Sequence, residues 1–169
     1  MTPVIQRFLE YVRHETTSCE ESTSRPSTPT QLAFAEKLAN ELKALGVSNV
    51  RTANGYVYGE IPATAGCEKE PAIGLIAHID TAPAASGANI HPQVVQYEGG
   101  DIMLNQKENI VMKEADFPFL ANYKGKELIV TDGTTLLGAD DKAGVAEIMT
   151  AAERLIKDGI PHGTVCIAF

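Results

Sequence analysis

The chain has 169 residues, of which 44% are apolar and 21% charged, an ordinary composition for one globular domain. Its formal net charge of −8 argues against nucleic acid or an anionic membrane surface as a partner, because a negatively charged protein repels polyphosphate. Three widely spaced cysteines without a Cys-x-x-Cys pair fit neither a disulfide framework nor a thiolate zinc site. The sequence shows no secretory signal and no membrane-length apolar run, so we expect a cytoplasmic protein.

Two helices are expected first. Thr2-Pro3 is a typical helix start, and apolar residues then recur at helical spacing to about His14. Residues 16–28 are rich in Ser, Thr, Glu and Pro, which predicts an exposed loop. A second helix follows and ends at Gly46, where a left-handed cap is expected. Its apolar positions are Leu32, Phe34, Ala35, Leu38, Leu42 and Leu45.

The middle of the chain predicts strands. The Asn54-Gly55 turn lies between residues 50–52 and 56–61, which indicates a hairpin. Residues 72–77 are continuously apolar, as in a strand that is buried on both faces of its sheet. Residues 81–122 are only weakly periodic and predict a long loop, which is more often functional than idle.

The last third predicts a strand at residues 127–131, an amphipathic helix at 141–157 and a buried strand at 164–169 that includes Cys166. Helices therefore alternate with strands. We expect the α/β class, as a three-layer α/β/α sandwich with a mixed, largely parallel sheet.

His78-Ile79-Asp80 directly follows the apolar strand at residues 72–77. The carboxyl ends of strands in open α/β sheets are where ligands bind. Residues two apart in an extended chain point to the same side. The Asp80 carboxylate is therefore placed to fix one ring nitrogen of His78, while the second ring nitrogen binds a metal. Taken alone, such a pair is more often a structural hydrogen bond than a metal site.

A second candidate is the block Gly138-Ala139-Asp140-Asp141-Lys142-Ala143-Gly144 at the start of a helix. Adjacent aspartates there have a structural explanation, because they cap free N–H groups and suit the helix dipole. The functional alternative is that Asp140 bridges two divalent ions while Asp141 holds the turn. For Lys142 we expect a solvated side chain in the first helical turn.

The order and spacing of several segments resemble tripeptide aminopeptidases of the M20 metallopeptidase family. The resemblance covers essentially the whole chain, and its most specific part is the Gly-Ala-Asp-Asp-Lys-Ala-Gly block. The other segments are His78 to Pro83, Asn89 to Val95, Gly99 to Ile102, Pro26 to Thr28 and Ile160 to Gly163.

This resemblance implies a zinc-dependent aminopeptidase with two Zn²⁺ ions that removes the N-terminal residue of tripeptides. His78 would bind one zinc ion, Asp140 would bridge both, and Asp80 would be a catalytic residue that orients and polarises His78. The family often has a cis peptide bond after the bridging aspartate. A small peptide is the implied partner, with a homodimer expected for the full-length protein.

The resemblance also implies that residues 1–169 are the N-terminal part of the catalytic domain, without its lid domain and C-terminal part. A Thr-Pro-Asp-Glu-Glu segment with the general base and a further zinc ligand would follow Phe169. We therefore predict that these 169 residues alone are inactive. A dipeptidase or aminoacylase of the same family remains an alternative, as does a non-catalytic binding or assembly module that keeps the scaffold.

Overall fold

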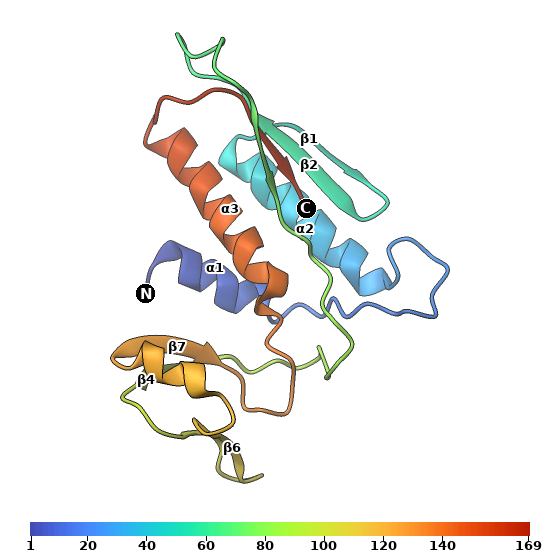
Figure 1. Cartoon of the computed structure of the whole chain (residues 1–169). Coiled ribbons are helices and arrows are strands. Elements are labelled where there is room, and N and C mark those ends of the chain that lie inside the picture. The colour runs from blue at the N-terminus through green and yellow to red at the C-terminus, as the bar shows by residue number, and fades with distance from the viewer.

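The computed structural model describes all of residues 1–169 (Figure 1). The helices are α1 (Pro3–Tyr11), α2 (Pro29–Leu45) and α3 (Ala139–Lys157), with one 3-10 helix, η1 (Pro118–Tyr123). None of the helices has the length and apolar character needed to cross a bilayer. The strands are β1 (Ser48–Ala53), β2 (Tyr56–Ile61), β3 (Ile73–Ile76), β4 (Gln93–Tyr97), β5 (Ile102–Asn105), β6 (Ile110–Met112), β7 (Lys126–Val130) and β8 (Val165–Ala168).

The main sheet has four strands in the order β1-β2-β8-β3. The β1–β2 hairpin is antiparallel as predicted, β2 also pairs antiparallel with β8, and β3 pairs parallel with β8. The expected α/β class with a mixed sheet is confirmed. Within this sheet, however, only one of the three pairings is parallel, because the β1–β2 hairpin and its pairing with β8 are antiparallel.

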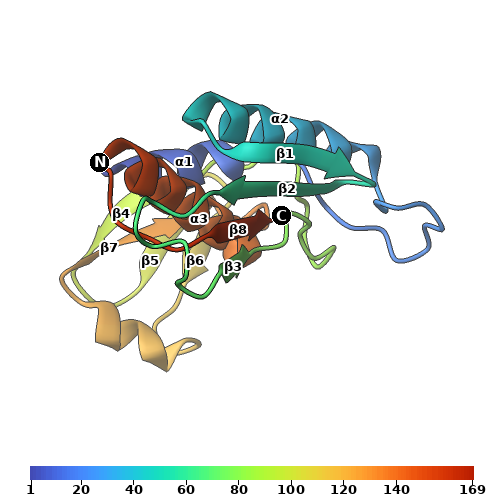
Figure 2. The same ribbon diagram turned by 90° about the horizontal axis from the view of Figure 1, so that it is seen from above.

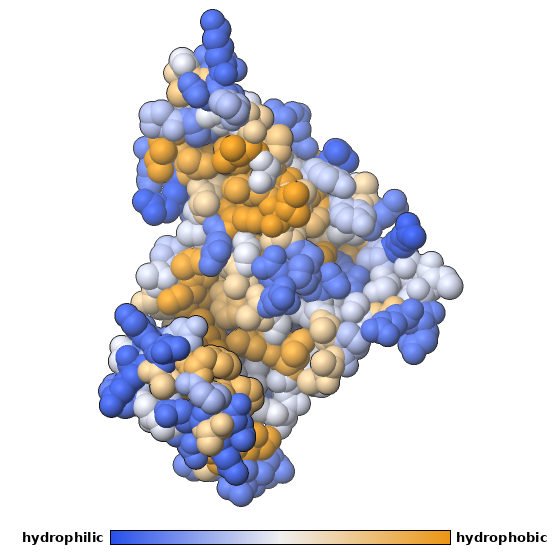
Figure 3. Space-filling view, viewed as in Figure 1, coloured by the Kyte–Doolittle hydropathy of each residue, from blue (hydrophilic) through white to orange (hydrophobic).

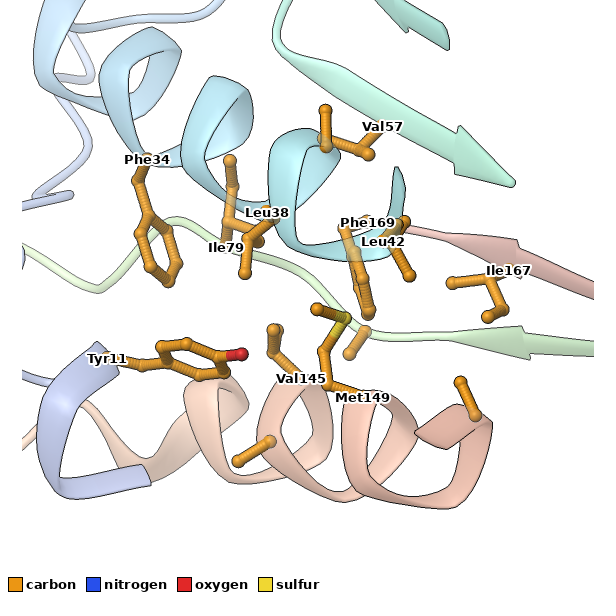
Figure 4. Packing of buried hydrophobic residues seen from close by; sticks show 14 of the residues in the cluster. Tyr11, Phe34, Leu38, Leu42, Val57, Ile79, Val145, Met149, Ile167 and Phe169 are labelled. Atoms are coloured by element: carbon orange, nitrogen blue, oxygen red, sulfur yellow. The ribbon is translucent and has the colours of Figure 1, made fainter. Parts of the chain in front are cut away.

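The three helices lie on one face of the main sheet (Figure 2) and share one core with it. Figure 4 shows Leu38 and Leu42 of α2 and Met149 of α3 facing Val57 and Ile167 of the sheet. The opposite face of the sheet carries no helix of this chain, so these residues form two layers and not three.

Local sequence signals set the helix ends. Pro3 and Pro29 occupy the first turns of α1 and α2, where their missing N–H costs nothing. Gly46 ends α2 with φ of 91°, which confirms the predicted left-handed cap. Leu32, which we assigned to the apolar face of α2, is 45% exposed. Thr16 was expected in an exposed loop but is fully buried, because the segment after α1 passes beneath the loop that follows β3.

The prediction that residues 72–77 form a strand buried on both faces is wrong. Ile76 is 78% exposed and Ile73 is 53% exposed. The reasons are that β3 is an edge strand with β8 on one side only, and that Ile76 lies on the same face of the sheet as Cys166, which no helix covers. Cys166 of β8 is exposed for a related reason, since its side chain lies on the uncovered face. In the view of Figure 1, apolar surface lies over the area where β3 and β8 run (Figure 3).

Residues 81–122 contain more regular structure than the sequence predicted. Strand β4 pairs with β7, β5 pairs with β6, and η1 follows, with a small core of Tyr97, Ile102 and Leu120. The Tyr97 hydroxyl donates a hydrogen bond to Glu114 at 2.6 Å, and this bond and that from the Gly100 N–H lower the pKa of Glu114. These strands are short, and turns that contain Gly99, Gly100 and Asn109 at positive φ separate them, which hides their periodicity.

Leu38 and Leu32 of α2 provide a matched test of the core. Leu38→Ala removes a fully buried side chain and should lower the free energy of unfolding by about 2–5 kcal/mol. Leu32→Ala, at an exposed position of the same helix, should lower it by less than about 1 kcal/mol. Urea denaturation followed by circular dichroism measures both values, and equal losses would show that α2 does not pack as described.

Candidate metal centre

His78 and Asp80 leave the carboxyl end of β3 on the same side of the chain. Ile79 between them is only 8% exposed and lies beside Leu38 and Phe34 in the core (Figure 4). Because side chains alternate along an extended segment, burial of Ile79 turns His78 and Asp80 outward. Their side chains are 53% and 48% exposed.

Asp140 and Asp141 reach the same place from the start of α3. Gly138 precedes them with φ of 73°, and a Cβ there would lie 2.9 Å from Cγ2 of Thr81, the residue after Asp80. The close approach of these two segments therefore requires glycine. The peptide bond between Asp140 and Asp141 is cis, as the resemblance implied, and both residues depart from helical geometry.

His78 joins the two segments. Its Nε2 lies 2.8 Å from Oδ1 of Asp140, and its Nδ1 lies 3.2 Å from Oδ1 and 3.0 Å from the backbone oxygen of Asp80. Ligand atoms of His78, Asp140 and Asp141 all lie within 4.8 Å of one another, and this is the only such group of three in the chain. An imidazole nitrogen with carboxylate oxygens is a donor set that suits a divalent ion such as zinc.

The carboxylates also perturb the acid–base behaviour of His78. Partial burial alone lowers the pKa of His78, but the hydrogen bond with Asp140 and the charge of Asp80 outweigh it. The pKa therefore lies above the ordinary value for histidine. A cation, either a proton or a metal ion, is favoured at this imidazole.

Asp141 and Lys142 have different structural roles. Oδ1 of Asp141 accepts a hydrogen bond from the Gly144 N–H at 3.2 Å, which caps the regular part of α3 and agrees with the turn-holding role expected for Asp141. The expectation that Lys142 is solvated is wrong, because its side chain is only 1% exposed. Burial lowers the pKa of Lys142 to about 8. Sequence periodicity did not indicate this burial.

The other histidines lie outside the group of three. His14 pairs with Glu10 at 2.9 Å, and Nδ1 of His162 lies 2.7 Å from the Gly163 carbonyl oxygen. His91 is exposed in the loop before β4 and adds to the lowering of the pKa of Asp132, whose main cause is hydrogen bonding from Thr134. The structure thus brings together His78, Asp80 and Asp140, the three site residues expected from the sequence, and adds Asp141.

Asp140→Asn tests the contact with His78 in metal-free protein. Loss of the carboxylate removes a group that favours the imidazolium form, so the pKa of His78 should fall toward about 6.5. NMR titration of the carbon-bound protons of the His78 imidazole measures this pKa. Asp158→Asn, at the far end of α3, is the control and should leave this pKa unchanged. An unchanged pKa in Asp140→Asn would contradict the geometry.

Comparison with known proteins places this site in a wider context. No protein-family model matches the chain. It is 55% identical over 171 residues to peptidase T of Desulfitobacterium hafniense (strain Y51), an alignment that covers all of this chain and 42% of that protein. Identity to peptidase T of Clostridium botulinum (strain 657 / Type Ba4) is 52% over 172 residues, again covering all of this chain and 42% of the relative.

Among solved structures, aminopeptidase PepT from Bacillus cereus ATCC 10987 superimposes with a TM-score of 0.62 at 23% identity, over 98% of this chain and 35% of that one. This likeness supports the α/β fold. The chain spans about two fifths of the length of the curated relatives that it matches. All of its residues are thus homologous to a part of the proteins named peptidase T.

Proposed function

We propose that this chain supplies part of the metal centre of a zinc-dependent, cytoplasmic aminopeptidase that removes the N-terminal residue of tripeptides. The observation that carries the proposal is the convergence of His78, Asp140 and Asp141 within 4.8 Å, with Asp80 behind the imidazole. The homologues named peptidase T support a peptide as the substrate.

The residues present fit a zinc site. A bound zinc ion supplies Lewis acidity and lowers the pKa of water. His78 would hold the ion through Nε2, while Asp80 accepts a hydrogen bond from Nδ1–H and so fixes the tautomer and the ring orientation. The Asp140 carboxylate has two oxygens and a side chain that is 93% exposed, so it would hold metal together with His78.

The donors in this chain are fewer than a catalytic pair of ions requires. Catalytic zinc typically uses three protein ligands and a water, and two ions would have to share His78, Asp140 and Asp141. The mechanism also needs a general base, and the contacts of Asp80 support a role in orienting His78 instead. We therefore keep the prediction that these 169 residues alone do not cleave peptides.

Zinc binding by the chain itself is directly testable. Zinc at about 100 times its dissociation constant should stabilise the folded chain by about 2.7 kcal/mol, because only the folded state brings His78 and Asp140 together. Differential scanning calorimetry should show a higher melting temperature with zinc, and His78→Ala should abolish the rise. His162→Ala, outside the site, is the control. An equal rise in His78→Ala would place the bound zinc elsewhere.

Activity is best tested in a chimera. Residues 1–169 would replace the matching segment of the D. hafniense peptidase T, with the unmodified protein as positive control. We expect tripeptide cleavage that a chelator abolishes, and a loss of about 10- to 100-fold in Asp80→Ala because the orientation of His78 is lost.

The chimera also separates the alternatives. Preference for a dipeptide or an N-acyl amino acid would identify a different hydrolase activity. A folded chimera with no hydrolysis of any of these substrates would support a non-catalytic module and contradict the proposal.

A further inference from the structure

Lys142 is a buried ammonium group without an acidic partner. Its side chain is 1% exposed, and it takes part in no ion pair although Asp140 and Asp141 precede it directly in the chain. Burial of a charge is costly unless hydrogen bonds compensate for it. An apolar side chain of similar length would fill the same space at lower cost, so the charge needs an explanation.

The ammonium group contacts the segment that follows α1 and a ring on α2. Nζ of Lys142 donates a hydrogen bond to the backbone carbonyl oxygen of His14 at 2.5 Å. It also lies 5.4 Å from the ring centroid of Phe34, within the range of a cation–π interaction. The His14 ring stacks on the same Phe34 ring with centroids 5.1 Å apart. Lys142 therefore connects the start of α3 to the segment after α1 and to α2.

Residues 14–18, which we name the anchor segment, hold the other half of the site as well. The Thr81 N–H donates to the Thr16 carbonyl oxygen at 3.1 Å, and the Ser18 N–H donates to the Thr81 carbonyl oxygen at 2.9 Å. Thr81 directly follows Asp80. Gln31 of α2 keeps the anchor segment in place through hydrogen bonds of 3.3 and 3.4 Å to the carbonyl oxygens of Thr16 and Thr17.

The two metal-binding segments are thus attached to the same short stretch of backbone. His78 lies three residues before Thr81, and Asp140 lies two residues before Lys142. We infer that Lys142 is a positioning residue whose hydrogen bond to His14 sets Asp140 opposite His78 through the shared anchor segment. The inference rests on the proposed metal site, and it explains why a charged Lys142 is buried at this position.

The ammonium group suits this task better than a neutral donor. Charge-assisted hydrogen bonds are roughly twice as strong as neutral ones, and Lys142 spans from α3 to a backbone carbonyl that no substitution can remove. The contact lies beside the point where Asp140 and Asp141 depart from helical geometry, so helix hydrogen bonds alone do not fix Asp140.

The test is Lys142→Met in the whole chain, with zinc affinity measured by competition with a chromophoric chelator. We expect about 10- to 100-fold weaker binding, the usual effect of losing a residue that orients a ligand. The melting temperature of the metal-free variant should stay the same or rise, because replacing a buried charge with an apolar group is often neutral or stabilising. If Lys142→Met does not fold, the same zinc affinity and melting temperature are measured for Lys142→Gln, which is also uncharged.

Met149→Ala is the matched control, since Met149 is buried two turns further along α3. It should lower the melting temperature and leave zinc affinity unchanged. Parental affinity in the folded Lys142 variants, or an equal loss in Met149→Ala, would overturn the inference.

A second readout needs no metal. Crystal structures of the metal-free variants should show the 2.8 Å contact between His78 and Asp140 retained in Met149→Ala and lost in Lys142→Met. If the parent chain binds no zinc, the metal site fails but this comparison still decides the role of Lys142. Retention of the contact in Lys142→Met would overturn the inference.

Discussion

The burial of Ile79 is the constraint on which the site depends. Ile79 lies in the core between helices and sheet, and its neighbours in an extended segment must therefore point the other way. That alternation places the His78 imidazole and the Asp80 carboxylate on one side, with Asp80 against Nδ1 and Nε2 left to face Asp140. Core packing thus decides which nitrogen of His78 is available for a ligand.

Bringing Asp140 to His78 is a separate problem, because 61 residues lie between them in the sequence. Neither β3 nor α3 alone fixes the position of Asp140 relative to His78. Strand β3 is a four-residue edge strand, and α3 is irregular at Asp140 and Asp141. Hydrogen bonds to residues 14–18 connect the two segments, and Gly138 allows their close approach to Thr81. A segment that carries no candidate ligand thereby shapes the site.

The sequence predicted those features that local signals determine. The turn at Asn54-Gly55, the cap at Gly46 and the positions of β7 and α3 follow from residue types with strong backbone preferences. His78, Asp80 and Asp140 could be selected because a recognisable motif surrounds each of them. The approach of Asp141 to His78 depends on the geometry of the turn at Asp140, which spacing does not reveal.

The features that the sequence did not predict depend on tertiary neighbours. The apolar run at residues 72–77 is typical of a doubly covered strand, but whether a face is covered depends on what packs against it, and β3 has only β8 beside it. Lys142 occupies a helical position where lysine is normally solvated. Its burial arises because the segment after α1 and Phe34 of α2 pack over the start of α3.

Electrostatics explains why such a site favours a cation. Asp140 and Asp141 place two carboxylates within 4.8 Å of the His78 imidazole, in a chain whose net charge is already −8, and carboxylates this close repel one another. Asp140 and Asp80 both raise the pKa of His78, so they favour a positive charge at this imidazole. The ammonium of Lys142 points away, toward His14, and makes no ion pair with them. A divalent ion in place of a proton on His78 would neutralise more of this charge, so the arrangement that favours imidazolium also favours metal binding.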